Sequence, residues 1–168
     1  MSKWNSQTAL YPDLCVQRLN LVESRALSRK SEKIATLIEA CRGKDQDPHY
    51  LGYFECFNRQ WFYEAHDVLE ELWLATRHTP NDGFYKGLIQ FAGAFVHLQK
   101  DRLQPAASLF KLSRTYLARY PDKHEGLDLK SVLHLISQWL ERLEEGCFTS
   151  NPLRKYNAPS LIINNLRD

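Results

Sequence analysis

The sequence predicts an all-α protein, a single compact multi-helical bundle built around an antiparallel central helix hairpin. Apolar residues recur at every third or fourth position along nearly the whole chain, which is the spacing of amphipathic helices. The strand-like run at residues 161–163 is too short to form a sheet by itself. The length of 168 residues is that of one domain, with enough mass to bury a core without metals or disulfides.

The composition excludes several classes of protein. With 43% hydrophobic and 25% charged residues, the chain is neither disordered nor of low complexity. The four cysteines form no Cys-x-x-Cys pair, so neither a zinc ribbon nor a disulfide scaffold is expected. A net charge of +2 does not predict a nucleic-acid partner, and we expect none. The N-terminus lacks a signal-like apolar run and no segment is long enough to span a membrane, so a cytoplasmic protein without a membrane partner is expected.

The N-terminal part is expected to form two helices. The first covers about residues 12–42 and ends at Gly43 and the polar residues 44–48. A short helix follows over about residues 49–57 and ends at Asn58, a residue type that tolerates left-handed backbone.

The two central helices are expected over about residues 60–77 and 84–99. The intervening residues 78–83 contain Pro80 and Gly83, which do not continue a helix. The second of these helices is apolar around most of its circumference, which predicts a central position.

The C-terminal part is expected to form two more helices and a docked tail. One helix covers about residues 104–120 and ends before Pro121, and the other covers about residues 129–145, with Asp128 as its N-cap. The domain organisation that follows is an N-terminal helical extension over residues 1–48, a core over 49–121 that carries the site, and a C-terminal helix and tail over 122–168.

The helix at residues 60–77 places an imidazole and a carboxylate on its apolar side. At about 100° per residue, one arc of about 120° holds six residues of mixed character. These are Phe62, Tyr63, His66, Leu69, Glu70 and Trp73. Asp67 lies on the opposite, solvated side of the same rotation. Charged groups are rarely buried without partners, so His66 and Glu70 are expected to meet polar groups of a neighbouring helix.

Those partners are expected on the helix at residues 84–99. Its polar stripe holds Gly87, Gln90, Ala94 and His97. A short connection makes neighbouring helices antiparallel, which sets Glu70 opposite Gln90, His66 opposite Ala94 and Tyr63 opposite His97.

This cluster has a structural and a functional interpretation. In the structural interpretation the histidine–carboxylate pair only bridges two helices, because buried polar groups find hydrogen-bond partners. In the functional interpretation His66 and Glu70 are catalytic, with Glu70 orienting His66 as a general base. Tyr63, Trp73, Gln90 and His97 would then bind the ligand. As a metal site, His66, Glu70 and His97 would supply three ligands and leave one position open.

The same residues resemble the prokaryotic domain of unknown function 309 family. The motif is His-x-x-x-Glu-x-x-Trp, here His66, Glu70 and Trp73, followed by Gly-Leu-Ile-Gln at residues 87–90 and a histidine, His97. The resemblance extends over about residues 51–121, with Asp67 where the family commonly has Glu. It implies a compact all-helical domain and supports His66, Glu70 and Trp73 as a functional cluster, but it supplies no reaction.

The sequence therefore predicts a helical domain that binds a small molecule or a divalent metal at a His/Glu/Gln/His site, with hydrolysis as a candidate reaction. The alternative is a non-catalytic interaction module or homo-oligomer in which the cluster only sets helix register. A weaker alternative is nucleic-acid binding through residues 1–44, which carry eight Lys or Arg against four Asp or Glu. No cofactor is specified by any of these patterns.

Overall fold

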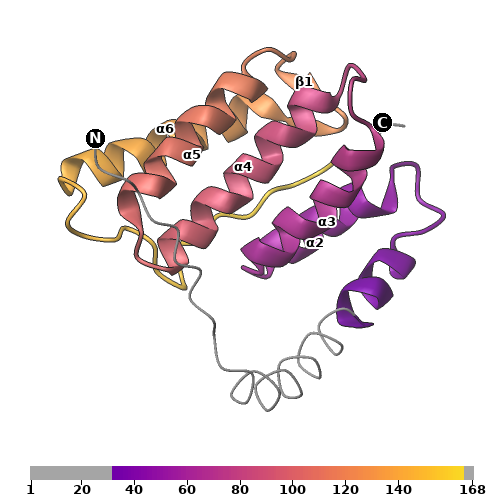
Figure 1. The fold of residues 1–168 in the computed structure, drawn as a ribbon, viewed down its shortest axis with the longest axis horizontal. Coiled ribbons are helices and arrows are strands. Elements are labelled where there is room, and N and C mark those ends of the chain that lie inside the picture. Colours follow the sequence, from indigo (N-terminus) through magenta and orange to yellow (C-terminus); the bar gives the residue numbers. More distant parts are fainter. Residues whose placement is uncertain (1–31, 165–168) are drawn as a thin grey trace, which may run out of the picture.

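A computed structural model describes residues 32–164 of the chain (Figure 1). Residues 32–40 are helical. The elements that follow are α2 (Pro48–Asn58), α3 (Phe62–Ala75), α4 (Asp82–Gln99), α5 (Leu103–Leu117), β1 (Lys123–His124), β2 (Leu127–Asp128) and α6 (Leu129–Glu145). The predicted all-α helical bundle is confirmed.

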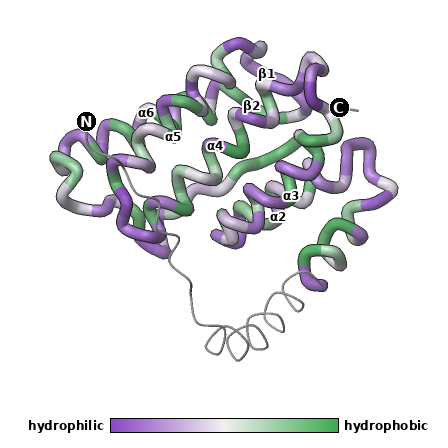
Figure 2. The backbone as a smooth tube through the Cα atoms, in the orientation of Figure 1, coloured by the Kyte–Doolittle hydropathy of each residue, from purple (hydrophilic) through white to green (hydrophobic). Residues whose placement is uncertain are grey.

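Helix α4 lies in the middle of the bundle, with α3 along one side and α5 along the other (Figure 1). It is buried along most of its length. Its aromatic residues join the core, where Phe91 stacks on Phe57 and Phe95 packs against Phe62. Figure 2 shows the hydrophilic residues concentrated in the connecting turns rather than along α4. The predicted central position of this helix is therefore confirmed.

Helices α3 and α4 form the predicted antiparallel hairpin. At one end the side-chain amide of Gln99 donates to the carbonyl of Gln60, at 3.0 Å. At the other end the indole N–H of Trp73 donates to Asp82 Oδ1, at 2.5 Å. The start of one helix thus lies beside the end of the other.

Helices α4 and α5 approach each other closely at a glycine. A Cβ atom on Gly87 would lie 2.6 Å from Leu117 Cδ2, so any side chain there would collide with a buried leucine. The hydroxyl of Ser113 on α5 donates to the carbonyl of Gly87, at 2.8 Å, and is fully buried. The missing side chain thus allows a direct hydrogen bond from one helix to the backbone of the other.

Helix boundaries agree with the prediction to within a few residues. α6 covers the predicted residues, and Asp128 accepts a hydrogen bond from the Ser131 N–H at 3.1 Å, as an N-cap does. The hairpin of β1 and β2 was not predicted. It turns at Glu125 and Gly126, whose φ angles are 49° and 77°, and it is too short to show a periodic sequence pattern.

The tail after α6 crosses the bundle and docks on it, as expected. Asn58 of α2 binds the backbone of Leu161 with both side-chain groups, at 2.9 Å to its carbonyl and 2.7 Å from its N–H. Ile163 pairs with Leu127 of β2.

Most of the helix predicted over residues 12–42 lies outside the described residues, as does Cys15. Among the described cysteines, Cys41 and Cys56 are buried and Cys147 is exposed, and all three are free thiols. Burial raises the pKa of Cys56 to about 12. Within residues 32–164, no helix combines the length and the apolar character needed to cross a membrane.

Replacing Ser113 by Ala is expected to lower the free energy of unfolding by about 1 kcal/mol, because the bond between α5 and α4 is lost. Urea denaturation measures this difference. Ser108→Ala is the matched control, since the exposed Ser108 hydroxyl bonds only within α5, to Gln104. Equal effects of the two substitutions would contradict a role of Ser113 in joining the helices.

Candidate functional site

The site lies on the edge of α3 that faces α4. The buried side of α3 consists of Phe62, Ala65, Val68, Leu69 and Leu72. His66, Asp67, Glu70 and Trp73 are half-buried along its border. The predicted stripe therefore exists, but His66 and Glu70 reach solvent instead of being enclosed.

Asp67 contacts the site, although the prediction placed it on the opposite, solvated side of the helix and left it out of the site. Nδ1 of His66 lies 3.1 Å from Oδ1 of Asp67. The Asp67 side chain is 45% exposed and that of His66 is 33% exposed. A helical rotation describes where Cα–Cβ bonds point, and it missed a carboxylate that reaches sideways to the preceding residue.

Three residues of α3 together form a candidate metal-ligand cluster. His66, Asp67 and Glu70 each offer one ligand atom, and these atoms lie within 4.8 Å of one another. All three side chains are half-buried. We call this set the His66 cluster.

The imidazole of His66 lies against α4 at Gly93. Its Cδ2 atom is 3.9 Å from the position that a Gly93 Cβ would take, and Leu109 of α5 lies 3.2 Å from that same position. The predicted neighbour was Ala94, one residue further along α4, and Ala94 is fully buried. The predicted register is thus correct to one residue, and the neighbour of the ring on α4 is a glycine rather than an alanine.

Tyr63 lies beside His66 at the outer end of the site. Its ring is nearly parallel to the imidazole, with centroids 6.5 Å apart and an interplanar angle of 22°. The residue is 50% exposed, and the ammonium group of Lys100 lies 5.9 Å from its ring centre. Tyr63 therefore contributes an accessible aromatic surface next to the His66 cluster.

Gln90 is half-buried on α4 between two residues that contact the α3 stripe. Lys86, one turn before it, reaches the ring of Trp73, and Gly93, almost one turn after it, meets His66. Residues at this spacing share one face of a helix. Gln90 therefore faces the stripe, and within residues 32–164 the side chains of Gln90 and Glu70 form no hydrogen bond with each other, an interaction that the sequence left open.

His97 lies apart from the cluster. Within residues 32–164, the three ligand-type side chains whose ligand atoms lie within 4.8 Å of one another are His66, Asp67 and Glu70, so the candidate ligand set lies entirely on α3 and does not include the predicted His97. The Nδ1 atom of His97 is buried without a hydrogen-bond partner in the described part of the chain. Burial lowers the pKa of His97, and the positive charges of Arg102 and Lys100 lower it further.

Trp73 has its polar group occupied. Its indole N–H bonds Asp82 across the turn between α3 and α4, and this bond is the main cause that lowers the pKa of Asp82. The guanidinium of Arg77 lies 4.5 Å from the ring centre. In this arrangement Trp73 fastens the helix hairpin, and a ligand would meet its ring rather than its N–H.

A second polar cluster, around His124, was not predicted from the sequence. Its ring packs between Phe84 and Tyr120, with centroid distances of 4.7 and 4.9 Å. Its Nε2 atom lies 2.8 Å from Asn81 Oδ1, and the Asn81 amide donates to Glu125 at 2.8 Å. This network fixes the β1–β2 hairpin to the start of α4. No helical spacing relates these residues, so periodicity gave no signal for it.

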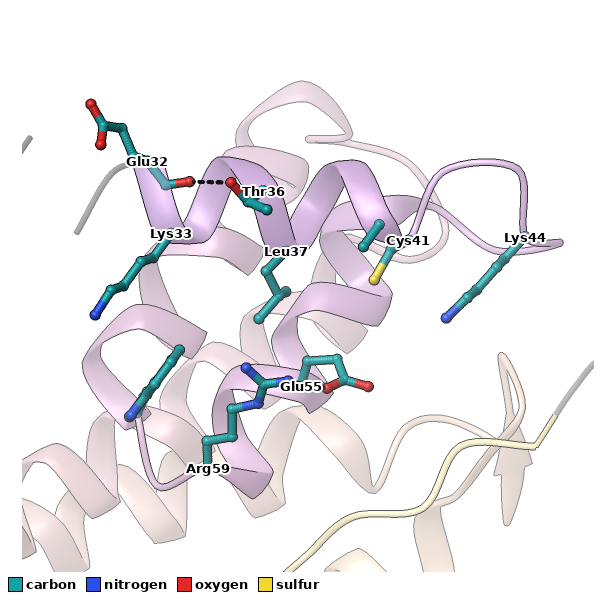
Figure 3. Close-up of a pocket in the computed structure, with 10 residues that line it drawn as sticks. Glu32, Lys33, Thr36, Leu37, Cys41, Lys44, Glu55 and Arg59 are labelled. Atoms are coloured by element: carbon teal, nitrogen blue, oxygen red, sulfur yellow. Dashed lines mark hydrogen bonds and ion pairs between the residues drawn. The ribbon is translucent and has the colours of Figure 1, made fainter. Parts of the chain in front are cut away.

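A separate cavity of about 730 Å³ lies between residues 32–44 and the end of α2 (Figure 3). Lys33 and Lys44 lie near opposite ends of it, and Arg59 pairs with Glu55 at 3.2 Å. None of the predicted site residues lines this cavity.

The free energy of unfolding is expected to decrease as the pH falls through the window just below 6.5, the ordinary pKa of His97. In that window the unfolded chain binds a proton that the folded state, with its lowered pKa, does not yet bind. His97→Gln should reduce this decrease. Urea denaturation between about pH 7 and about pH 5 measures it, with the exposed His134→Gln as control. An unchanged pH dependence in His97→Gln would contradict the assignment.

Residues 50–109 match the family model described as Domain of unknown function (DUF309). An uncharacterised protein of Aquifex aeolicus (strain VF5) is 30% identical over 99 residues, which are 59% of this chain and 29% of the relative. The chain therefore spans less than a third of the length of that relative. The matched segment holds His66, Asp67, Glu70, Trp73, Gln90 and His97, together with Tyr63. The predicted resemblance is thus confirmed over residues 50–109, the segment that matches the model of this family.

Proposed function

We propose that this domain binds a divalent transition metal at the His66 cluster. The observation that carries the proposal is the convergence of an imidazole and two carboxylates, each with one ligand atom within 4.8 Å of the others. The family match supports the choice of this site only in that it covers all three residues.

The charges of the cluster favour a cation. Two neighbouring carboxylates repel each other, and an ion between Asp67 and Glu70 would replace this repulsion with attraction. The described part of the chain brings no Lys or Arg into an ion pair with either of them. A bound metal would therefore supply the missing positive charge.

The ligand set indicates the class of ion. One imidazole with two carboxylates suits first-row metals such as Zn²⁺, Fe²⁺ or Mn²⁺ better than Ca²⁺, which prefers oxygen alone. Zinc ligands lie about 2 Å from the ion, so they come within about 4 Å of one another. Small side-chain rotations of these half-exposed residues would close the remaining gap.

Three protein ligands would leave one coordination position of the metal for water. A metal ion there would supply a nucleophilic hydroxide at neutral pH, which supports hydrolysis as the reaction class. Gln90 faces the stripe from α4 with its amide unbonded, so it can hydrogen-bond a substrate. Tyr63 offers an exposed ring at the outer edge of the same site.

The alternative, in which the cluster only sets helix register, has less support. Such a role requires hydrogen bonds between helices, and the His66–Asp67 contact lies within α3. Neither Glu70 nor Gln90 bonds the other helix in the described residues. A role in holding two copies of the chain together stays a prediction of the sequence alone.

Wild-type protein treated with a chelator is expected to take up about one Zn²⁺ per chain, because the site has three ligands. His66→Ala should lose that uptake, whereas His49→Ala should retain it. His49 is the matched control because it also lies between two carboxylates, at 3.3 Å from Asp47 and 3.3 Å from Glu71. Equilibrium dialysis with elemental analysis measures the stoichiometry. No uptake by wild type, or equal uptake by His66→Ala, would refute the proposal.

Glu70→Ala is expected to change the free energy of unfolding of the metal-free protein by less than about 0.5 kcal/mol, since no protein hydrogen bond is lost. The same variant should lose zinc uptake. A destabilisation near 3 kcal/mol, measured by urea denaturation, would instead indicate a buried structural partner.

A further inference from the structure

Three cations gather around two aromatic rings next to the His66 cluster. The guanidinium of Arg77 lies 4.5 Å and the ammonium of Lys86 lies 5.8 Å from the ring centre of Trp73. Lys86 also lies 5.0 Å from the ring centre of Tyr116, and the guanidinium of Arg119 lies 5.3 Å from it. Lys86 thus links two rings that belong to α3 and α5. We call these five residues the cation–aromatic patch.

The cations of the patch have no acidic partner. Within residues 32–164, none of the three takes part in an ion pair, whereas Arg59 elsewhere in the bundle pairs with Glu55. Asp82 carries a negative charge close by, but it already accepts hydrogen bonds from the Trp73 indole and from the backbone N–H of His78. The patch therefore keeps a net positive charge.

Contact with a ring positions a cation without neutralising it. The attraction comes from the ring quadrupole, so the full charge remains available to an anion. A guanidinium that lies over a ring still directs its five N–H donors outward in its own plane, and a lysine keeps three donors. Arg77, Lys86 and Arg119 are thus held in place with donors free, which lowers the entropic cost of binding an anion.

The patch shares a face with the His66 cluster. On α3, Trp73 follows Glu70 by about one turn, and on α4, Lys86 precedes Gln90 by one turn. Tyr116 extends the same face onto α5, which lies on the other side of α4 (Figure 1). An anionic group on the patch would therefore lie within a few turns of helix from His66.

We propose that the cation–aromatic patch binds a small ligand with two or more linked phosphate groups. Lys86 lies near both rings and so links Arg77 and Arg119 into one group of three positive charges, which favours a ligand with more than one negative charge. Phosphate oxygens are also the acceptors that arginine donors fit best. The ring faces that would stack on the bases of single-stranded nucleic acid already carry cations, which favours the small ligand. The proposal does not require the metal.

The test uses inorganic pyrophosphate as the probe, titrated into the full chain by calorimetry in metal-free buffer of low ionic strength. Wild type is expected to bind it, and Lys86→Gln is expected to weaken binding by roughly tenfold, as the loss of a charge-assisted hydrogen bond does. Arg142→Gln is the matched control, because Arg142 lies 5.0 Å from the ring centre of Trp139 on α6, outside the patch. Its affinity should equal that of wild type.

If circular dichroism shows that Lys86→Gln is misfolded, the exposed Arg119→Gln serves instead, with the same expected loss. Absence of pyrophosphate binding by wild type would overturn the proposal, as would equal losses in the patch variant and in Arg142→Gln. A single-stranded oligonucleotide that binds more tightly than pyrophosphate would also overturn it, in favour of a nucleic-acid surface. Because these titrations contain no metal, their failure leaves the zinc experiment unaffected.

Discussion

The close packing of α4 between α3 and α5 is the constraint on which the rest of the structure depends. A glycine within a helix costs about 1 kcal/mol relative to alanine, and α4 carries Gly87 and Gly93 in its interior. Each has a specific neighbour: Leu117 occupies the space at Gly87, and His66 and Leu109 meet at Gly93. The missing side chains thus let α5 approach α4 closely, since Leu109 and Leu117 both belong to α5, and the aromatic core that this approach closes offsets the cost of the glycines.

This packing explains why the candidate site lies at the border of the core. His66 is close enough to α4 for its ring to contact Gly93, but its nitrogen atoms remain beside Asp67 and solvent. Full burial of two carboxylates without partners would cost free energy, because both would lose their hydration. Half-buried carboxylates keep their bound water until a cation displaces that water. The same border position holds the cations of the cation–aromatic patch. One face of the three helices therefore presents carboxylates at one end and unpaired cations at the other, an arrangement suited to a metal and an anion held together.

The sequence predicted the helices and their mutual orientation well, because both follow from periodic burial. The predicted bounds of α6 agree with the structure. The predicted neighbour of His66 on α4 differs from the observed one by a single residue. The site itself was predicted less completely. Asp67 was assigned to the solvated side, since a helical rotation does not describe how far a side chain reaches. His97 was assigned to the ligand set because it shares a stripe with Gln90, but a shared stripe does not give the distance between side chains along the helix. The cluster of His124, Asn81 and Glu125 could not be predicted from the sequence, because strands of two residues are too short to show a periodic pattern.

The cavity beside α2 and the His66 cluster are two different candidate sites. They differ in how many of their residues lie within the segment that matches the family model. Most of the residues that line the cavity, from Glu32 to Lys44, precede the segment that matches the family model. One of the cations that line the cavity is already neutralised, because Arg59 forms an ion pair with Glu55. The His66 cluster lies wholly inside the matched segment and combines residue types that bind metals, with no internal ion pair to a lysine or arginine in the described chain. The size of a cavity measures only the available space, whereas the charges of the His66 cluster indicate which ligand would bind there, and this is why we propose the site on α3 rather than in the cavity.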